Sequence, residues 1–267
     1  MSDLARNPAP ARAASWDDRL DGENGFDLAR LIFATLVVFE HSFYLPYNNY
    51  GAEPLYILSG GQTDFGTLAV NGFFAISGFL ITRSCLLTDN AARYFKKRLA
   101  RIVPGFMLAS LLGIFVFGPL GADDAAAFLG QINVRGTLVR VLSLHQSSLS
   151  ETFQHNPMRG MLDGTLWTIK YEFDCYVCVA ILWVFGLLRR GPVTALLIAL
   201  TAGLALQRIG VFTPPAIDHG VPAILVSSPA NWPRLFSFFF AGAAFYLWRD
   251  AIPKSPRSEE HTSELQS

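Results

Sequence analysis

The chain has 267 residues, of which 51% are hydrophobic and only 16% charged, and its 21 basic residues balance 21 acidic ones. A soluble globular domain usually has about 25% charged residues. Together with a mean hydropathy of +0.33, this composition indicates a protein that crosses a membrane several times. It excludes a disordered chain, a coiled coil and a disulfide-stapled secreted domain. The zero net charge and the lack of a groove-reading motif argue against a nucleic-acid partner.

The end of the chain differs in character from the rest. Residues 257–267 follow a hydrophobic segment abruptly and resemble the translation of a sequencing-adapter oligonucleotide. We therefore expect residues 255–267 to be a non-native, disordered tail and the native C-terminus to be missing. Without 257–267 the chain has 20 basic and 18 acidic residues, a net charge of +2.

Six hydrophobic segments predict an all-α fold, a polytopic transmembrane helical bundle. The first four have 20 to 23 residues, enough to cross a hydrocarbon core of about 30 Å as helices. Helices are required because each backbone group in lipid must find its partner within the segment. The predicted spans are residues 28–47, 67–87, 102–121, 166–188, 192–207 and 234–248.

The distribution of positive charge predicts the orientation. If the N-terminus is inside, the inner segments hold 12 Lys and Arg residues and the outer segments hold 4, as the positive-inside rule requires. Residues 1–27 are then a cytosolic tail, followed by a membrane domain over 28–254. The long outer segment includes 128–144, whose apolar spacing predicts either an amphipathic helix at the outer interface or a packed loop helix.

The first span contains ionisable residues that lipid disfavours. Arg30 precedes the apolar run and His41 follows it, next to Glu40. Eleven helical residues turn the chain by about 1100° and raise it by about 16 Å, so Arg30 and His41 share one face at different depths. Histidine suits proton transfer and arginine suits a phosphate-bearing donor. The alternative is that Arg30 is a cytosolic anchor and His41 a hydrogen-bonded packing residue.

The fourth span repeats this pattern with Glu172 and Asp174 inside its apolar run. Glu172 is expected at a depth comparable to His41, where it could orient the imidazole or bind an acceptor hydroxyl. The alternative is an acid neutralised by a hydrogen bond between helices. Lys170 is expected to snorkel to the interface. Cys175 and Cys178 have C-x-x-C spacing, but without a second ligand pair we expect inert buried thiols and no metal.

Small residues interrupt the second span. Gly72, Ser77 and Gly78 are expected to let helices approach closely. The alternative for Ser77 is that it carries the acyl group as a nucleophile, although no adjacent base is evident in the sequence.

Four ordered blocks over residues 24–254 resemble acyltransferase family 3, the bacterial membrane O-acyltransferases that modify surface polysaccharides. The blocks are Arg30-x10-His41 within residues 26–41, the stretch 70–81, the basic run 93–104 and the stretch 164–173. The resemblance implies transfer of an acyl group, often acetyl, from cytosolic acyl-CoA to a sugar hydroxyl at the outer face of the inner membrane. It implies no bound cofactor.

The resemblance also implies roles for particular residues. His41 would be the general base, and Glu172 would orient the base or bind the acceptor. Near the inner mouth, Arg30 would hold the CoA phosphates together with Arg98 and Arg101. The other residues expected to bind substrate are Trp167 and Ser77. For Arg98 and Arg101 the alternative is that they serve only the positive-inside topology.

The chain departs from the family pattern in two ways. Asp163 and Lys170 stand where relatives more often have uncharged residues, and only six of about ten expected spans are present. Whether a chain shortened in this way is active stays open. The rival hypothesis is a transporter in which Arg30, His41 and Glu172 form a proton relay, although the sequence has no repeated halves. Acyl chain, acceptor sugar and oligomeric state are not predicted.

Overall fold

The computed structural model describes residues 25–146, 152–160, 164–215, 217 and 225–252. Within these ranges the protein is helical and contains no strand, which confirms the all-α prediction. The expectations for the cytosolic tail before Gly25, for the tail 255–267 and for Asp163 lie outside the described residues.

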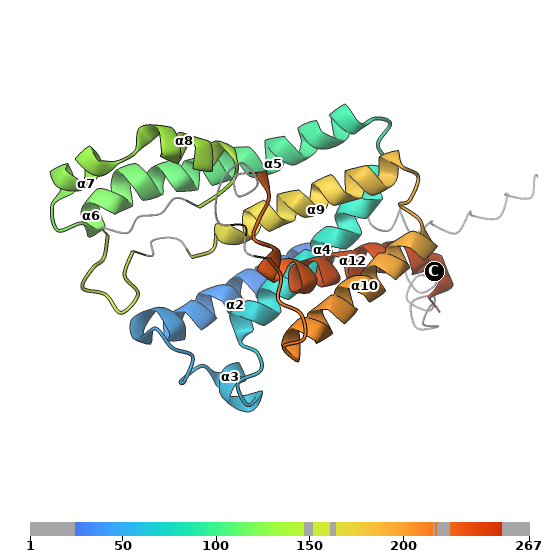
Figure 1. Ribbon diagram of the computed structural model, residues 1–267, viewed down its shortest axis with the longest axis horizontal. Helices are drawn as coiled ribbons and strands as arrows, with labels where there is room; N and C mark the ends of the chain where they lie inside the picture. The colour runs from blue at the N-terminus through green and yellow to red at the C-terminus, as the bar shows by residue number, and fades with distance from the viewer. Residues whose placement is uncertain (1–24, 147–151, 161–163, 216, 218–224, 253–267) are drawn as a thin grey trace, which may run out of the picture.

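Long helices occupy all six predicted spans (Figure 1). They are α2 (Phe26–Tyr47), α4 (Phe65–Leu86), α5 (Ala91–Leu112) continued by η1 (Gly113–Phe117) and α6 (Gly118–Gly121), α9 (Trp167–Val184), α10 (Arg190–Arg208) and α12 (Trp232–Trp248). The largest difference from the predicted bounds is in α5, which begins well before residue 102. Its basic run is already helical because the side chain of Asn90 accepts the backbone N–H of Arg93 and starts the helix there.

Four helices in the described part of the chain are long and apolar enough to cross a membrane: α2, α4, the continuous rod Ala91–Gly121 and α10. The protein is therefore a helical membrane bundle, as predicted. The other two long helices differ for physical reasons. Helix α9 carries Lys170, Glu172 and Asp174, and α12 has only 17 residues.

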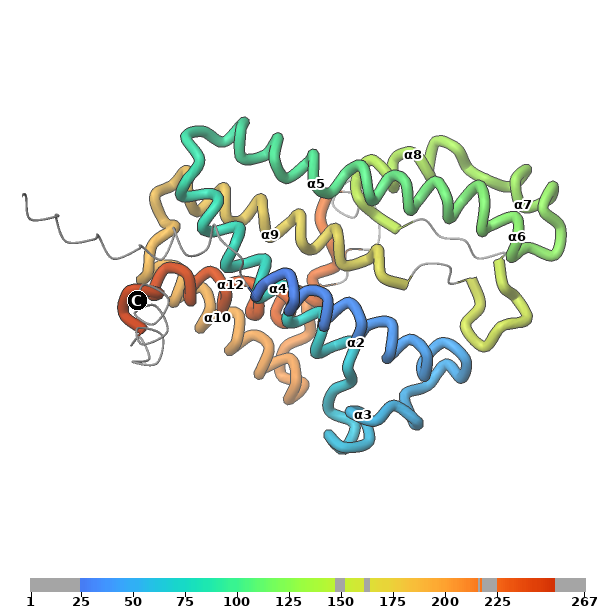
Figure 2. The backbone as a smooth tube through the Cα atoms, turned by 180° about the vertical axis from the view of Figure 1, so that it is seen from behind, coloured from blue at the N-terminus to red at the C-terminus, as the bar shows by residue number. Residues whose placement is uncertain are grey.

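Helix α4 lies at the centre of the bundle. It packs against α12, α2 and α9, and α12 also packs against α10, as Figures 1 and 2 show from opposite sides. Helices α4 and α12 cross in backbone contact. A Cβ atom on Gly78 would lie 1.8 Å from the carbonyl oxygen of Phe239, and one on Gly242 would lie 1.9 Å from that of Ala75. The prediction that Gly78 lets helices approach closely is thus confirmed.

The amphipathic stretch 128–144 forms parts of two short helices rather than one. Helices α7 (Ala125–Gln131) and α8 (Val134–Leu142) lie alongside the second half of the α5–η1–α6 rod. Phe128 and Val141 are buried, whereas Val134 is 72% exposed. Asn133 separates the helices because its side chain accepts the backbone N–H of Gly136 and begins α8. The segment is packed on one side and keeps apolar side chains on the other.

The prediction that Lys170 snorkels is wrong. Lys170 is only 6% exposed, and its Nζ lies 2.5 Å from Asp174 Oδ1 and donates to the carbonyl oxygen of Leu225 at 2.7 Å. The other oxygen of Asp174 accepts the backbone N–H of Ser227 at 3.0 Å and its hydroxyl at 2.6 Å. Asp174 lies one turn after Lys170 on α9, so its carboxylate keeps the ammonium of Lys170 buried within the bundle. The pair ties the segment before α12 to α9.

Breaking this pair is expected to destabilise the protein. Lys170→Met leaves the carboxylate of Asp174 buried without its cation, which costs about 3–5 kcal/mol of unfolding free energy. Thermal unfolding in nanodiscs measures the effect. The control is Arg93→Gln, which breaks the exposed pair with Asp89 and should change stability by less than about 1 kcal/mol. Equal melting of Lys170→Met and wild type would contradict a buried pair.

Candidate functional site

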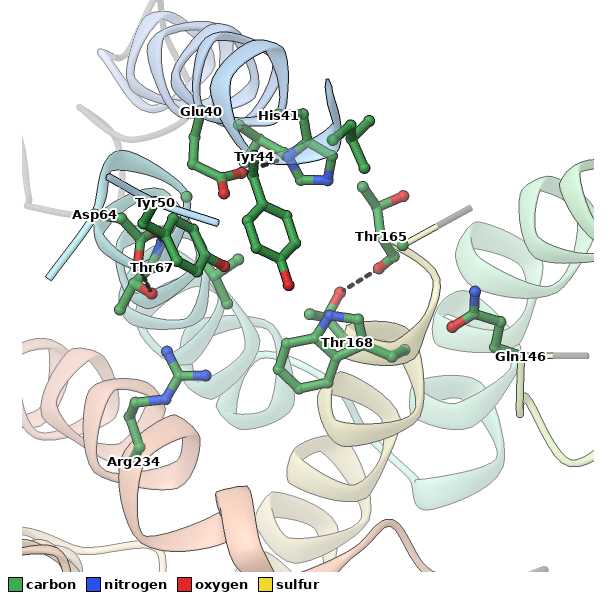
Figure 3. A pocket seen from close by; sticks show the side chains of 16 residues that line it. Glu40, His41, Tyr44, Tyr50, Asp64, Thr67, Gln146, Thr165, Thr168 and Arg234 are labelled. Carbon is green, nitrogen blue, oxygen red and sulfur yellow. Dashed lines mark hydrogen bonds and ion pairs between the residues drawn. The ribbon is translucent and has the colours of Figure 1, made fainter. Parts of the chain in front are cut away.

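A pocket of about 460 Å³ lies at the end of the bundle where α2 ends and α4, α9 and α12 begin. This is the end that the charge distribution predicts to be outer. Its volume is within the usual range for a small-molecule site. Figure 3 shows side chains from all four helices facing it. Those on which the chemistry depends are Glu40, His41, Tyr44, Tyr50, Trp167 and Arg234.

A histidine–glutamate pair forms one wall of the pocket. Nδ1 of His41 lies 2.6 Å from Oε2 of Glu40, and Glu40 is only 3% exposed. Gly66 makes room for this carboxylate, since a Cβ atom there would lie 2.9 Å from Glu40 Oε2. The other ring nitrogen of His41 is on the side that faces the pocket (Figure 3). A carboxylate this close to Nδ1 electrostatically favours a proton on that nitrogen, which leaves Nε2 as the proton acceptor.

Aromatic side chains form much of the remaining wall. The rings of Tyr44 and Tyr50 stack with centroids 4.3 Å apart, and Trp167 stands at the start of α9 in edge contact with Tyr171. Burial, and secondarily the carboxylate of Glu40, raise the pKa of Tyr50 above its ordinary value. Its hydroxyl therefore stays protonated and can donate a hydrogen bond. Such walls offer flat apolar faces together with hydroxyl groups.

Two of the seven residues that we predicted for the site, His41 and Trp167, line this pocket. Arg30 lies near the opposite end of α2, where its Nη1 is 3.2 Å from Oδ1 of Asp27. Eleven residues of helix separate Arg30 from His41, a rise of about 16 Å. The structure therefore places Arg30 near the start of α2 and His41 further along the same helix, not together in one contact site.

Three more of the predicted residues meet in the bundle interior. Oε1 of Glu172 accepts the hydroxyl of Ser77 at 2.9 Å and also the hydroxyl of Tyr176. The guanidinium of Arg98 lies 5.9 Å from the ring centre of Tyr176. Arg98 is buried and donates to Ser84. This interior cluster links α4, α5 and α9. Arg101, one helical turn further along α5, is exposed.

The carboxylate beside His41 is therefore Glu40, and the described lining of the pocket does not include Glu172. Sequence reasoning had considered Glu172 for that position. It also missed Arg234, which projects into the pocket from the first turn of α12. A signal was available for Arg234, because an arginine opening a hydrophobic segment on the expected outer side goes against the positive-inside rule.

The three cysteines are free, and Cys85 and Cys175 are buried. Thiols buried in apolar surroundings react poorly. Among the described residues no group of three or more His, Cys, Asp and Glu side chains could hold a metal ion.

The fold and the pocket define a helical membrane protein with a carboxylate-paired imidazole facing a cavity of small-molecule size. The family model described as an acyltransferase domain, that of acyltransferase family 3, matches residues 23–258. The chain belongs to this family.

Two curated relatives illustrate the similarity. An O-acetyl transferase of Shigella phage Sf6 is 32% identical over 158 residues, which are 59% of this chain and 45% of that protein. Nodulation protein 10 of Rhizobium leguminosarum bv. viciae is 30% identical over 165 residues, 60% of this chain and 44% of that protein. The matched region thus spans less than half the length of each relative. No solved structure matches the chain.

Proposed function

We propose that the protein is a membrane-bound O-acyltransferase that moves an acetyl group from acyl-CoA to a hydroxyl of a carbohydrate. The observation that carries the proposal is the pair of Glu40 and His41 on the wall of the pocket. Membership of acyltransferase family 3 and the name of the phage relative, an O-acetyl transferase, support the reaction type.

In this mechanism His41 acts as the general base. Its Nε2 takes the proton from the acceptor hydroxyl while that oxygen attacks the thioester carbon of the acyl donor. The new C–O bond forms, the C–S bond breaks, and the CoA thiolate leaves with the proton that His41 returns. Glu40 stabilises the imidazolium that exists between the two proton transfers.

The donor enters, in this proposal, from the opposite end of the bundle. Arg30 near the start of α2 and the basic turns of α5 share that end, since Phe26 of α2 packs on Phe79 near the end of α4. Arg101 is exposed there, and a guanidinium binds phosphate through paired hydrogen bonds. This arrangement fits a protein of the bacterial inner membrane with a cytoplasmic N-terminus.

The direct test uses the complete gene product in proteoliposomes, supplied with radiolabelled acetyl-CoA and the native surface polysaccharide. We expect label in base-labile esters of the polysaccharide and release of free CoA. Dissipation of a solute or proton gradient without consumption of acetyl-CoA would instead support the transporter. If no label is transferred and no CoA is released, the proposal is overturned.

Glu172 is expected to act as a positioning residue. Glu172→Gln removes the charge that Ser77 and Tyr176 donate to, and hydrogen bonds to a charged group contribute about 1.5–3 kcal/mol each. We expect kcat to fall at least about tenfold with normal membrane insertion and little change in KM. The control is Asp123→Asn, which alters an exposed carboxylate. Normal turnover in Glu172→Gln would assign the residue to packing alone.

A further inference from the structure

Arg234 is a half-buried cation within the pocket. Its guanidinium points into the cavity, across from Glu40 and His41 (Figure 3). Its contact within the described chain is a long hydrogen bond from Nη1 to Oδ1 of Asn71, at 3.4 Å. Among the described residues no carboxylate lies within 4.0 Å of it. Because only one of its N–H groups has this weak bond, most of the guanidinium's hydrogen-bond donors can bind a ligand.

The acidic residues of the pocket are engaged elsewhere. Glu40 pairs with His41. Asp64 accepts the backbone N–H of Thr67 at 2.6 Å through one oxygen and the hydroxyl of Thr67 at 2.7 Å through the other. Asp64 is thus the N-cap of α4, where the helix dipole offsets its negative charge. Neither carboxylate neutralises Arg234 directly.

We propose that the pocket takes an acidic sugar, whose carboxylate or phosphate group Arg234 binds while a hydroxyl of the same sugar lies against His41. The inference rests on the proposed function, since it names the class of the acceptor. A guanidinium recognises both groups by paired, charge-assisted hydrogen bonds. Tyr44 and Trp167 line the same pocket and offer ring faces to the apolar side of a sugar.

Binding tests the inference independently of catalysis. The complete gene product in nanodiscs is titrated with glucuronate, glucose 6-phosphate and neutral glucose, and binding is followed by the fluorescence of tryptophan, because Trp167 lines the pocket. Wild type is expected to bind one or both acidic sugars at least about tenfold more tightly than glucose. The acidic sugar that binds more tightly shows whether Arg234 prefers a carboxylate or a phosphate group. Arg234→Gln should lose this preference and Arg234→Lys should keep part of it.

Two further variants separate the possible causes. Arg208→Gln removes a charge from the exposed end of α10, near Arg234 but outside the pocket lining, and should keep the preference. His41→Ala should keep it too, because His41 acts on the hydroxyl. Equal binding of acidic and neutral sugars, no binding of any, or a preference that survives Arg234→Gln overturns the inference. If His41→Ala keeps the preference for acidic sugars and also acylates at the normal rate, only the proposed role of His41 is overturned.

Discussion

Replacement of His41 by alanine is expected to lower the rate of acyl transfer by about 10²- to 10⁴-fold, the usual contribution of a general base. The pocket would keep its aromatic walls and Arg234, so acceptor binding should change little and the loss should appear in kcat. The measurement is the steady-state rate of CoA release by the complete gene product, with KM determined in parallel. Partial rescue by added imidazole would identify proton transfer as the missing step.

Two companion variants sharpen this test. Glu40→Gln keeps the shape of the side chain but removes the charge that stabilises the imidazolium, and it should also reduce kcat strongly with little change in KM. His155→Ala removes an exposed imidazole at a distance from the pocket and should leave the rate unchanged. Acylation by His41→Ala at the wild-type rate would remove His41 from the mechanism, whatever the effect of Glu40→Gln.

The second large effect is expected on stability. Gly78→Ala places a methyl group where the carbonyl oxygen of Phe239 lies, 1.8 Å away. A backbone atom in the neighbouring helix cannot move aside as a side chain would, so the crossing of α4 and α12 must open. We expect a loss of about 3 kcal/mol or more, at the upper end for overpacked sites. Thermal unfolding in nanodiscs measures it.

A matched control exists within the same fold. Gly203→Ala adds the same methyl group to α10, where no heavy atom lies within 4 Å of the new Cβ. It should leave the melting temperature unchanged or raise it slightly, because alanine favours the helix. Equal melting temperatures for Gly78→Ala and Gly203→Ala would contradict the backbone contact between α4 and α12.

The sequence predicted the spans well because hydrophobic length is a strong constraint in lipid. All six predicted segments are long helices in the structure. It predicted the start of α5 poorly, because the charge of the basic run favours an inner segment outside the span. Asn90 begins the helix at Ala91, and long basic side chains on a helical turn satisfy the positive-inside rule as well as a loop does.

The site was only partly predictable, for geometric reasons. Glu40 precedes His41 directly, and adjacent residues of a helix usually point about 100° apart. The sequence therefore did not indicate Glu40 as the partner of His41, and depth alone favoured Glu172. The side chains of Glu40 and His41 converge because α4 presents Gly66 at this point, leaving space for the carboxylate. Lys170 and Asp174, by contrast, have the spacing of a helical ion pair, so this contact is visible in the sequence.

The sequence by itself determined that this is a helical membrane protein, that His41 lies within a span, and that its ordered blocks resemble acyltransferase family 3. These properties depend on hydropathy, on helical periodicity and on local motifs. Only the tertiary structure decided which polar side chains share a site. Contacts between helices depend on their crossing points, so His41 meets Glu40 and faces Arg234, while Glu172 meets Ser77 in the bundle interior.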